Sequence, residues 1–406
     1  MMEVLIVGAG GQGAPCASIM AKDVNISRIV LGDIDLDLAN RVKGRIRSDR
    51  ITAVKLDAGS VEEIEKAAQG VDVVVNLTPM RFNDNVMQAA LNSSAHYVDT
   101  ALGDTVWNQF LEGESLFLDQ EFKDAGLTAL VGCGVSPGVT NVLARYACDK
   151  LDRVDEIRVR LGFRDLDEGL IREWDPGWAP ETALSDYAER VQVLENGRLE
   201  EYPPFSGVEE HTFSAPVGPV VISHHAHEEP LLLGRFIGKG LKNCEFKYPL
   251  DPIAAALVKM GFAEREPIEV KGLRVAPLDV ISAMVRQPVS AFLWETEETV
   301  QLPVPTVGAL EIEVHGAKSD ESVTYRLTKV LSPSPEGQLQ LFRRLGTVQT
   351  LVALPAAIGA RMCVEGVAKG VIAPECLDPI AFLKAMSDAG APLAFTEECI
   401  KEVLIS

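Results

Sequence analysis

Short hydrophobic runs alternate with segments of helical periodicity through the first third of the chain. Apolar runs of about four to eight residues are typical of buried strands, and apolar residues spaced three and four apart are typical of amphipathic helices. A regular alternation of the two predicts a parallel, doubly wound sheet, which is an α/β fold. The predicted strands are 4–7, 28–33, 71–77, 96–101 and 128–133, and the predicted helices are 13–21, 60–70, 82–93 and 108–125.

Beyond this part of the chain, single apolar and polar residues begin to alternate. Such alternation over 154–163 predicts a strand with one face in water. Two further alternating segments, 307–315 and 322–331, are joined by a short polar link, which predicts a hairpin. The middle of the chain is therefore predicted to be an α+β domain with a mixed or antiparallel sheet. Residues 346–370 predict a long apolar helix with a kink at Pro355.

A glycine-rich motif follows the first predicted strand and opens the first predicted helix. Its sequence, Gly8-Ala-Gly10-Gly-Gln-Gly13, matches the GxGxxG fingerprint of dinucleotide-binding folds. Gly8 permits the tight turn, Gly10 lets the backbone approach the pyrophosphate, and Gly13 lets the helix pack on the strand. The N–H groups and dipole of the helix N-terminus attract the phosphates. We therefore expect this loop, Gln12 included, to bind a dinucleotide; the alternative is a glycine-rich turn that holds no cofactor.

Acidic residues near the end of the second strand favour one dinucleotide over another. Asp33 follows Gly13 by 20 residues, the spacing expected for the acid that binds the adenosine ribose. Its carboxylate accepts hydrogen bonds from ribose hydroxyls and repels a 2′-phosphate, and Asp35 and Asp37 add no positive charge nearby. NAD is therefore favoured over NADP. Asp57, at the end of a further strand, is a candidate adenine contact or an ordinary strand-end acid.

Polar residues stand where the next strands of the parallel sheet end. Ligands of open α/β sheets bind outside the carboxyl ends of the strands. Asn76, Thr78 and Pro79 follow the fourth strand, and Asp99 follows the fifth. We expect the first three to line the nicotinamide half of the cofactor and Asp99 to take part in catalysis, although turn chemistry alone also favours these residue types.

A second glycine-rich segment, 132–141, lies between a predicted strand and a helix. The N–H groups at Gly138 and beyond are candidates to cradle a substrate carboxylate or amide at the start of that helix. Ser136, Thr140 and Asn141 supply polar side chains for the same ligand. We expect this segment to form part of the substrate site.

Histidines and glutamates gather in the sequence His224-His225-Ala-His227-Glu228-Glu229. One interpretation is a substrate loop, in which His225 transfers a proton near neutral pH. The residues then expected to contact the substrate are His224, His227 and Glu228. A second interpretation is a metal site, because His225, His227 and Glu229 share one face of an extended segment. A third is a solvated strand end; we adopt the first and expect no metal.

The overall charge and the cysteines exclude several classes of protein. A formal net charge of −21 repels nucleic acids and anionic membranes, so neither is an expected partner. No apolar run reaches the roughly 18 residues of a membrane span, and the first residues lack the basic region of a signal peptide. The seven cysteines include no CxxC pair, which predicts free thiols and a reducing, cytoplasmic location.

Several of these stretches together resemble the saccharopine dehydrogenase-like proteins, a family that includes saccharopine reductases, lysine 6-dehydrogenases and carboxynorspermidine dehydrogenases. The most specific stretch is GCGVSPGVTN at 132–141, and the least specific is VLIVGAGGQG from residue 4. The loops 173–187 and 193–205 are most similar to the lysine 6-dehydrogenase branch, whereas 224–230 departs from the substrate loops of the family. The remaining stretches are DID from residue 33, VVNLTP from 74, YVDT from 97 and GVAKGVIAPE from 366.

The resemblance implies an organisation and an activity. It implies a Rossmann dinucleotide-binding domain at 1–135, a substrate and dimerisation domain at 136–345, C-terminal helices at 346–406 that return to the first domain, and a homodimer. The implied chemistry is hydride transfer between NAD and the CH–NH bond of a small amino-acid substrate such as lysine or saccharopine. The alternatives are a carboxynorspermidine dehydrogenase-like polyamine enzyme, a non-catalytic NAD-binding sensor or assembly protein, and a metal-dependent enzyme built on the histidines.

Overall fold

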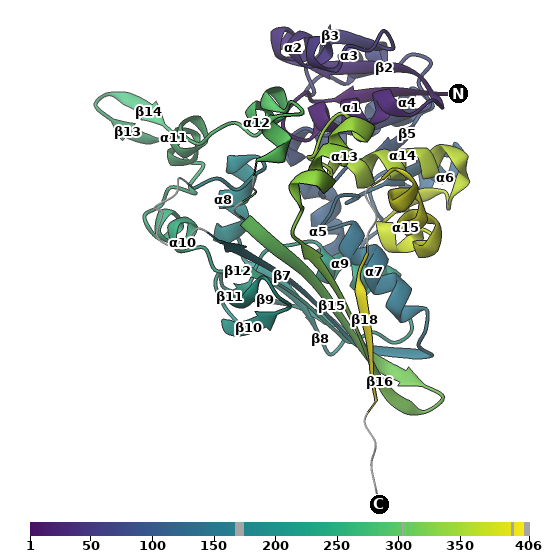
Figure 1. Ribbon diagram of the computed structural model, residues 1–406, viewed down its shortest axis with the longest axis vertical. Coiled ribbons are helices and arrows are strands. Elements are labelled where there is room, and N and C mark those ends of the chain that lie inside the picture. Colours follow the sequence, from purple (N-terminus) through teal and green to yellow (C-terminus); the bar gives the residue numbers. More distant parts are fainter. Residues whose placement is uncertain (167–173, 303, 305, 391–393, 402–406) are drawn as a thin grey trace, which may run out of the picture.

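The computed structural model describes residues 1–166, 174–302, 304, 306–390 and 394–401. Their strands form two large sheets, each with helices packed against it (Figure 1). One buried apolar cluster continues from the first sheet to the second. Within these residues, no helix is both long and apolar enough to span a bilayer. All seven cysteines fall within them as well, and none forms a disulfide.

The first sheet is parallel and seven-stranded. Its strands are β1 (Met2–Val7), β2 (Ile26–Asp33), β3 (Ile51–Lys55), β4 (Val73–Asn76), β5 (His96–Val98), β6 (Thr128–Leu130) and β17 (Gly370–Ile372). They lie in the order β17-β6-β5-β4-β1-β2-β3. The order reverses at β1, which lies between β4 and β2, and such a reversal opens the crevice where doubly wound sheets bind ligands. The predicted Rossmann fold is therefore confirmed.

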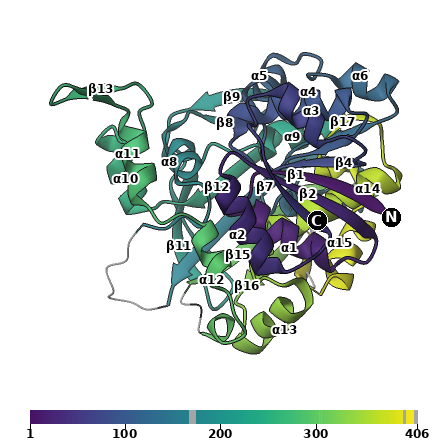
Figure 2. The same ribbon diagram turned by 90° about the horizontal axis from the view of Figure 1, so that it is seen from above.

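Both faces of this sheet are covered, which explains the continuous apolar runs in its strands. The helices around it are α1 (Gly13–Lys22), α2 (Leu36–Ile46), α3 (Val61–Ala67), α4 (Asn83–Asn92), α5 (Asp104–Glu112), α6 (Asp119–Asp124) and α14 (Ala353–Gly366). Alternate residues of β1 enter different cores: Val4 and Ile6 face one cluster, and Leu5 and Val7 face the other. The first cluster is completed by α1 and α14 and the second by α3 to α6, an arrangement visible from above in Figure 2.

Two predicted helices differ from the observed ones. The predicted helix 108–125 is two helices, α5 and α6, because Gly113 adopts a left-handed φ of 69° that ends α5. The predicted helix 346–370 begins only at Ala353, so Pro355 falls in its first turn, where a missing N–H leaves no helical bond unmade and no kink is required. The helix ends at Gly366, and the last residue of the predicted segment, Gly370, begins β17, which pairs with β6.

The second sheet is mixed and nine-stranded. Its strands are β7 (Arg153–Asp165), β8 (Val191–Glu195), β9 (Arg198–Tyr202), β10 (Glu209–Phe213), β11 (Gly218–His224), β12 (Asn243–Pro249), β15 (Thr306–Lys318), β16 (Glu321–Leu331) and β18 (Thr396–Lys401). The main order is β10-β11-β12-β7-β15-β16-β18, and β8 and β9 join beside β12. β12 and β7 are parallel, whereas β15 and β16 form the predicted antiparallel hairpin. The predicted mixed sheet is confirmed, but the C-terminal region expected to be helical also contributes β17 and β18.

The remaining elements connect the two sheets or extend beyond them. They are α7 (Val139–Cys148), α8 (Pro180–Ala188), α9 (Glu229–Phe236), α10 (Pro252–Lys259), β13 (Ile268–Val270), β14 (Leu273–Val275), α11 (Pro277–Met284), α12 (Val289–Trp294), α13 (Pro335–Leu345), α15 (Pro379–Asp388) and the short turns η1 (Met80–Phe82), η2 (Thr299–Gln301) and η3 (Pro374–Cys376). Helices α7 and α9 pack on one face of the second sheet, and α12 and α13 pack against α1. The β13–β14 hairpin and α11 project away from the body (Figure 1).

Candidate functional site

The loop between β1 and α1 has the geometry of a pyrophosphate cradle. Gly8 has a φ of 98°, and a Cβ there would lie 2.7 Å from the carbonyl oxygen of Leu77. A Cβ on Gly13 would lie only 1.8 Å from the carbonyl oxygen of Gly8. By contrast, no described atom lies within 4 Å of the place where a Cβ of Gly10 would stand. The three glycines therefore match the three roles predicted from the sequence, and open space beside Gly10 fits a dinucleotide at the start of α1.

The carboxylate of Asp33 is fixed beside this loop at the end of β2. One oxygen accepts a hydrogen bond from the N–H of Ala9 at 2.7 Å, and the other accepts from the N–H of Asp35 at 2.8 Å. The side chain is half-buried, so the carboxylate keeps a face toward solvent. Asp57 lies in the turn after β3 and accepts a hydrogen bond from the N–H of Gly59 at 2.8 Å. This contact matches the turn role that was the alternative to an adenine contact.

The polar residues at the carboxyl ends of β4 and β5 form one buried network. The amide nitrogen of Asn76 donates to Asn83 at 2.9 Å and to the Tyr97 hydroxyl at 3.1 Å. Its oxygen accepts from the hydroxyl of Thr78 at 2.6 Å. Asn76 and Thr78 are thus held by each other and by the core, and they shape the loop that also contains Pro79, the residue before η1. Sequence analysis missed Asn83, the first residue of α4, because nothing local distinguishes it from an ordinary helix start.

Asp99 is the hub of the same network. Its oxygens accept from Tyr97 at 2.9 Å, from Asn83 at 3.2 Å and from the N–H of Gly132 at 2.7 Å. Burial raises the pKa of Asp99 to about 8, although these hydrogen bonds oppose the shift. These contacts connect the ends of β4, β5 and β6. Asp99 therefore has a structural role in addition to the catalytic role predicted for it.

The second glycine-rich segment is closed on itself at the start of α7. Gly138 has a φ of 131°, and a Cβ there would lie 1.9 Å from the carbonyl oxygen of Gly134. The Gly138 N–H donates to Asn141 at 3.1 Å and is therefore not free to cradle a substrate carboxylate, which corrects that prediction. The Asn141 amide donates in turn to the buried Glu375 at 3.1 Å. Glu375, in η3, was not predicted, because it reaches this segment only through the return of the C-terminal chain.

Ser136 and Thr140 direct their hydroxyl groups at a carboxylate from the second domain. Both donate to the same oxygen of Glu229 in the first turn of α9, Thr140 at 2.9 Å. The other oxygen of Glu229 contacts Nδ1 of His227, and Nδ1 also lies 3.4 Å from a Glu228 oxygen. The N–H of Leu102, which follows β5, donates to Glu228 at 3.1 Å. These contacts bring the predicted substrate segments together between the two sheets.

Opposite charge and burial act against each other in this group. Burial alone would lower the pKa of His227, but the charge and hydrogen bond of Glu229 raise it to about 9. The same contacts lower the pKa of Glu229, although its burial acts in the opposite direction. Burial raises the pKa of Glu228 and raises that of Asp186, in α8, well above its ordinary value; the charge of His227 opposes both shifts. We call His227, Glu228, Glu229 and Asp186 the His227 cluster.

His225 lies beside the cluster in a different environment. Its ring centroid is 4.6 Å from that of Tyr187 and 5.0 Å from that of Tyr248, and no described residue hydrogen-bonds to it. Burial, followed by the charge of His227, lowers the pKa of His225 to about 3. The expectation that His225 titrates near neutral pH is therefore wrong, because its charged form is too costly among aromatic rings.

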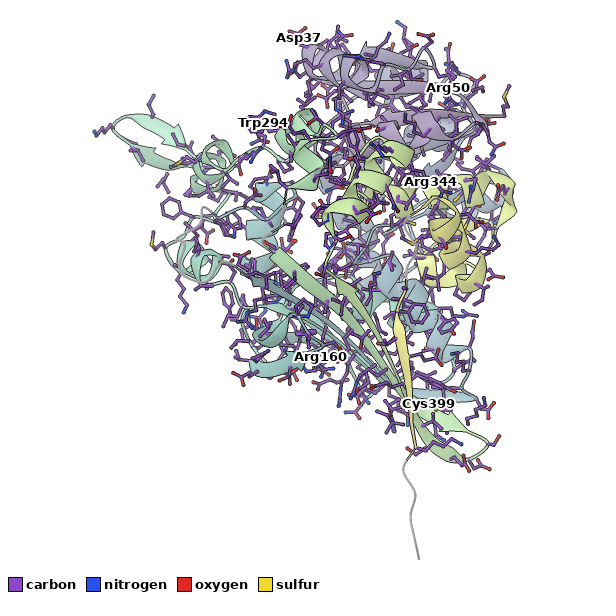
Figure 3. All side chains as sticks on the ribbon, viewed as in Figure 1. Asp37, Arg50, Arg160, Trp294, Arg344 and Cys399 are labelled. Carbon is purple, nitrogen blue, oxygen red and sulfur yellow. The ribbon has the colours of Figure 1, made fainter. Side chains whose placement is uncertain are left out.

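His224 is separated from the other two histidines by the alternation of the strand. As the last residue of β11 it lies 3.2 Å from Ser206 and 3.2 Å from Glu245, and Arg160 pairs with Glu245 at 3.4 Å. Figure 3 places Arg160 on the second sheet, well away from the Rossmann domain. The structure thus separates His224 from Glu228 and Glu229, the two carboxylates that contact His227. Among the residues that the structure describes, the one possible metal set also differs from the predicted one. It contains Glu228 in place of His225, and donor atoms of His227, Glu228 and Glu229 lie within 4.8 Å of one another.

A Rossmann sheet with an open phosphate cradle, joined to a second domain at a polar junction, is the architecture of a dinucleotide-binding protein. Comparison with known families is more specific: the saccharopine dehydrogenase NADP-binding domain matches residues 4–130, and the saccharopine dehydrogenase C-terminal domain matches 134–391. The chain therefore belongs to the saccharopine dehydrogenase family, and a nicotinamide dinucleotide is its class of cofactor.

Relatives and solved structures agree with this family. The chain is 27% identical to carboxyaminopropylagmatine dehydrogenase of Synechocystis over 97% of both chains. It is 26% identical to carboxynorspermidine synthase of Vibrio cholerae over 71% of this chain and 74% of that one. Its fold is similar to apo saccharopine dehydrogenase (L-Glu forming) from Saccharomyces cerevisiae, with a TM-score of 0.68 and 15% identity over 98% of this chain and all of that one. A homospermidine synthase from Legionella pneumophila, solved with NAD, gives a TM-score of 0.61 and 13% identity over 99% and 91% of the two chains.

Proposed function

We propose that this protein is an NAD-dependent oxidoreductase that acts on the secondary C–N bond of a carboxylated polyamine. This replaces the expected lysine or saccharopine substrate with the polyamine alternative. The observation that carries the proposal is the His227 cluster, where three carboxyl groups surround a single imidazolium ion. The names of two relatives, which denote enzymes of carboxylated polyamines, support the same choice.

The charge of the His227 cluster suits a cationic substrate. His227 contacts one oxygen of Glu229 and lies 3.4 Å from Glu228, so one imidazolium charge serves three carboxyl groups, and burial raises the pKa values of Glu228 and Asp186. An ammonium group bound beside these two carboxyl groups would favour their ionised forms and be held by charge-assisted hydrogen bonds. Asp186 and His227 are half-buried, so a ligand can reach them. A second amino-acid carboxylate, as in saccharopine, would meet like charge instead.

The reaction that follows from this arrangement is oxidation of an amine to an imine, or its reverse. When bound, the dinucleotide supplies the hydride acceptor or donor at the carbon of the C–N bond. The chain holds the two reactants in register, with the network of Asn76 and Asp99 fixing the loops at the ends of β4 and β5. His227 exchanges the proton of the substrate nitrogen, since its raised pKa keeps it protonated at neutral pH.

Turnover with a panel of amines tests this function. The change in NADH absorbance is followed with the compounds named in the two relatives, carboxyaminopropylagmatine and carboxynorspermidine, and with saccharopine and lysine as comparisons. We expect kcat/KM for one of the carboxylated polyamines to exceed that for saccharopine at least ~100-fold, because a site built around carboxyl groups leaves saccharopine with unpaired like charges. Equal or faster turnover of saccharopine or lysine would refute the substrate class. Tight cofactor binding without turnover of any compound would favour the sensor alternative.

Cofactor preference gives a separate prediction about Asp33. We expect the wild type to bind NAD more tightly than NADP, and Asp33→Asn to reduce this preference at least ~10-fold, because the amide removes the negative charge that repels a 2′-phosphate. The asparagine oxygen can still accept from the Ala9 N–H, which keeps the contact with the glycine loop, while the contact with the Asp35 N–H is lost. Dissociation constants for both dinucleotides, measured by calorimetry, check this. Asp37→Asn, an exposed acid in the first turn of α2, is the matched control and should leave the preference unchanged.

A further inference from the structure

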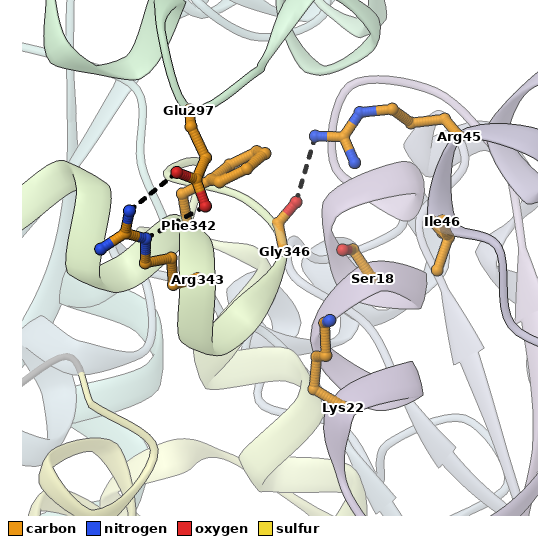
Figure 4. Close-up of a pocket in the computed structure, with 8 residues that line it drawn as sticks. All are labelled: Ser18, Lys22, Arg45, Ile46, Glu297, Phe342, Arg343 and Gly346. Carbon is orange, nitrogen blue, oxygen red and sulfur yellow. Dashed lines mark hydrogen bonds and ion pairs between the residues drawn. The ribbon is translucent and has the colours of Figure 1, made fainter.

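A basic groove lies at the end of α1 opposite the dinucleotide loop. It consists of two adjoining cavities of about 260 and 390 Å³ that share Lys22 and Ile46, and Figure 4 shows the first of them. Five cationic side chains and two acidic ones line it, a formal charge of +3 in a chain whose net charge is −21. The cations are Lys22, Arg45, Arg47, Arg50 and Arg343, and the acids are Asp49 and Glu297.

Two of the five cations are already occupied. Arg343 makes two hydrogen bonds to Glu297, at 3.0 and 2.8 Å. Arg50 donates to the carbonyl oxygens of Ala21 and Asp23 at the C-terminal end of α1. The contacts of Arg50 favour the binding of an anion nearby, because uncovered carbonyl groups at a helix C-terminus would repel it. Arg50 thus covers the carbonyl groups at the end of α1. Helices α2 and α13 also end at this groove, at Ile46 and Leu345, where Arg47 and Arg343 add positive charge.

The side chains of the other three cations make no hydrogen bond to a carboxylate among the described residues. The side chains of Lys22 and Arg47 are exposed, and neither makes a hydrogen bond or ion pair with any residue that the structure describes. Arg45 is held rigidly, since its guanidinium lies 4.9 Å from the ring centroid of Phe292 and 5.2 Å from that of Phe342. It donates to the carbonyl oxygen of Gly346 at 3.2 Å, and Glu295 is 3.6 Å away. Burial lowers the pKa of Arg45, so a nearby anion would also stabilise its charge.

We propose that the basic groove is a binding site for a phosphate group, with Lys22 and Arg47 as its mobile contacts and Arg45 as its fixed one. A phosphate carries a charge near −2 at neutral pH and three acceptor oxygens, which match three separate donors better than a single carboxylate does. The site lies at the opposite end of α1 from Gly13, so it is distinct from the cradle for the cofactor pyrophosphate.

Calorimetric titration at constant ionic strength tests the site. The protein is first saturated with reduced dinucleotide, which fills the loop at Gly8–Gly13, and inorganic phosphate and glycerol phosphate are then titrated separately. We expect one saturable site. Tighter binding of glycerol phosphate would identify an organic phosphate as the ligand class, and equal or weaker binding would identify the free ion.

Variants locate the binding. Lys22→Gln and Arg47→Gln should each weaken phosphate about 5- to 10-fold through the loss of one charge-assisted contact. Lys66→Gln is the matched control, because Lys66 is likewise an exposed lysine in the last turn of a helix of the same sheet, and it should bind as the wild type does. The proposal is overturned if neither phosphate gives a saturable signal, or if Lys22→Gln and Arg47→Gln bind as tightly as Lys66→Gln.

Discussion

The Gly13→Ala variant is expected to lose measurable binding of both NADH and NADPH. The added Cβ would stand 1.8 Å from the carbonyl oxygen of Gly8, which is a backbone atom of the same loop and cannot rotate away as a side chain could. The loop must therefore open, which moves the N–H groups at the start of α1 away from the pyrophosphate. We expect an increase in the dissociation constant of at least ~100-fold, about 3 kcal/mol, together with a lower melting temperature.

Two other glycines separate the possible causes of this loss. Gly10→Ala places its Cβ in open space, so it should preserve stability while weakening the dinucleotide that approaches the backbone there. Gly44→Ala lies within α2, meets no described atom within 4 Å, and should stabilise the protein by about 0.5–1 kcal/mol without changing cofactor affinity. Fluorescence titration and thermal unfolding of the three variants check these expectations. Wild-type affinity in Gly13→Ala would show that the dinucleotide does not bind at this loop.

Among substitutions in the His227 cluster, Glu229→Gln is expected to reduce the stability of the protein most. Glu229 is fully buried, pairs with His227, and accepts hydrogen bonds from Ser136 and Thr140. The glutamine can keep the two hydroxyl contacts but leaves the imidazolium without its nearest counter-charge. Removal of one partner of a buried pair costs roughly 3–5 kcal/mol, and the retained hydrogen bonds place this variant near the lower limit.

The pH dependence of this loss follows from the two pKa shifts. Because the pKa of His227 is raised to about 9, its contribution to stability is full below about pH 6.5, its ordinary pKa, and is lost as the pH rises through 9. Because the pKa of Glu229 is lowered, its contribution is full above its ordinary pKa and is lost at more acidic pH. The difference between wild type and variant should therefore be greatest between about pH 5 and 6.5 and should shrink toward pH 10.

Denaturant unfolding at several pH values measures that difference. The control is Glu321→Gln, which removes an exposed carboxylate paired with Lys401 at 2.7 Å and should change stability little at any pH. A Glu229→Gln loss that equals the control, or one that does not decline at alkaline pH, would contradict the charge assignment of the His227 cluster. Turnover should also fall in Glu229→Gln, because His227 would hold its proton less tightly at neutral pH.

The Rossmann half of the protein could be predicted because its signals are local. Strands buried on both faces appear as continuous apolar runs, and Gly8, Gly10 and Gly13 lie within one turn of each other, so spacing alone fixes their roles. Breaks in the helices were harder to predict. Gly113 ends α5 through its left-handed φ, yet the apolar periodicity continues past it and suggests one longer helix.

The histidine-rich segment shows where such reasoning fails. The sequence groups His224, His225 and His227 within four positions. His224, at the end of β11, contacts Glu245 in the cluster with Arg160, and packing encloses His225 among aromatic rings. Of the three histidines, only His227 contacts Glu228 and Glu229. The different pKa values of His225 and His227 arise from burial and neighbours that come from distant parts of the chain.

The sequence by itself therefore determined the class of fold and marked the glycine loop and Asp33 as candidates for the dinucleotide site, because strand–turn–helix patterns and fixed spacings can be recognised without the tertiary structure. Only the tertiary structure decided which side chains meet at the junction of the two sheets. Asp186 in α8 and Glu375 in η3 come from distant parts of the chain, and no local sequence pattern identifies them as site residues. Burial and partner charges, which set the protonation of His225 and His227, exist only once those segments have packed together.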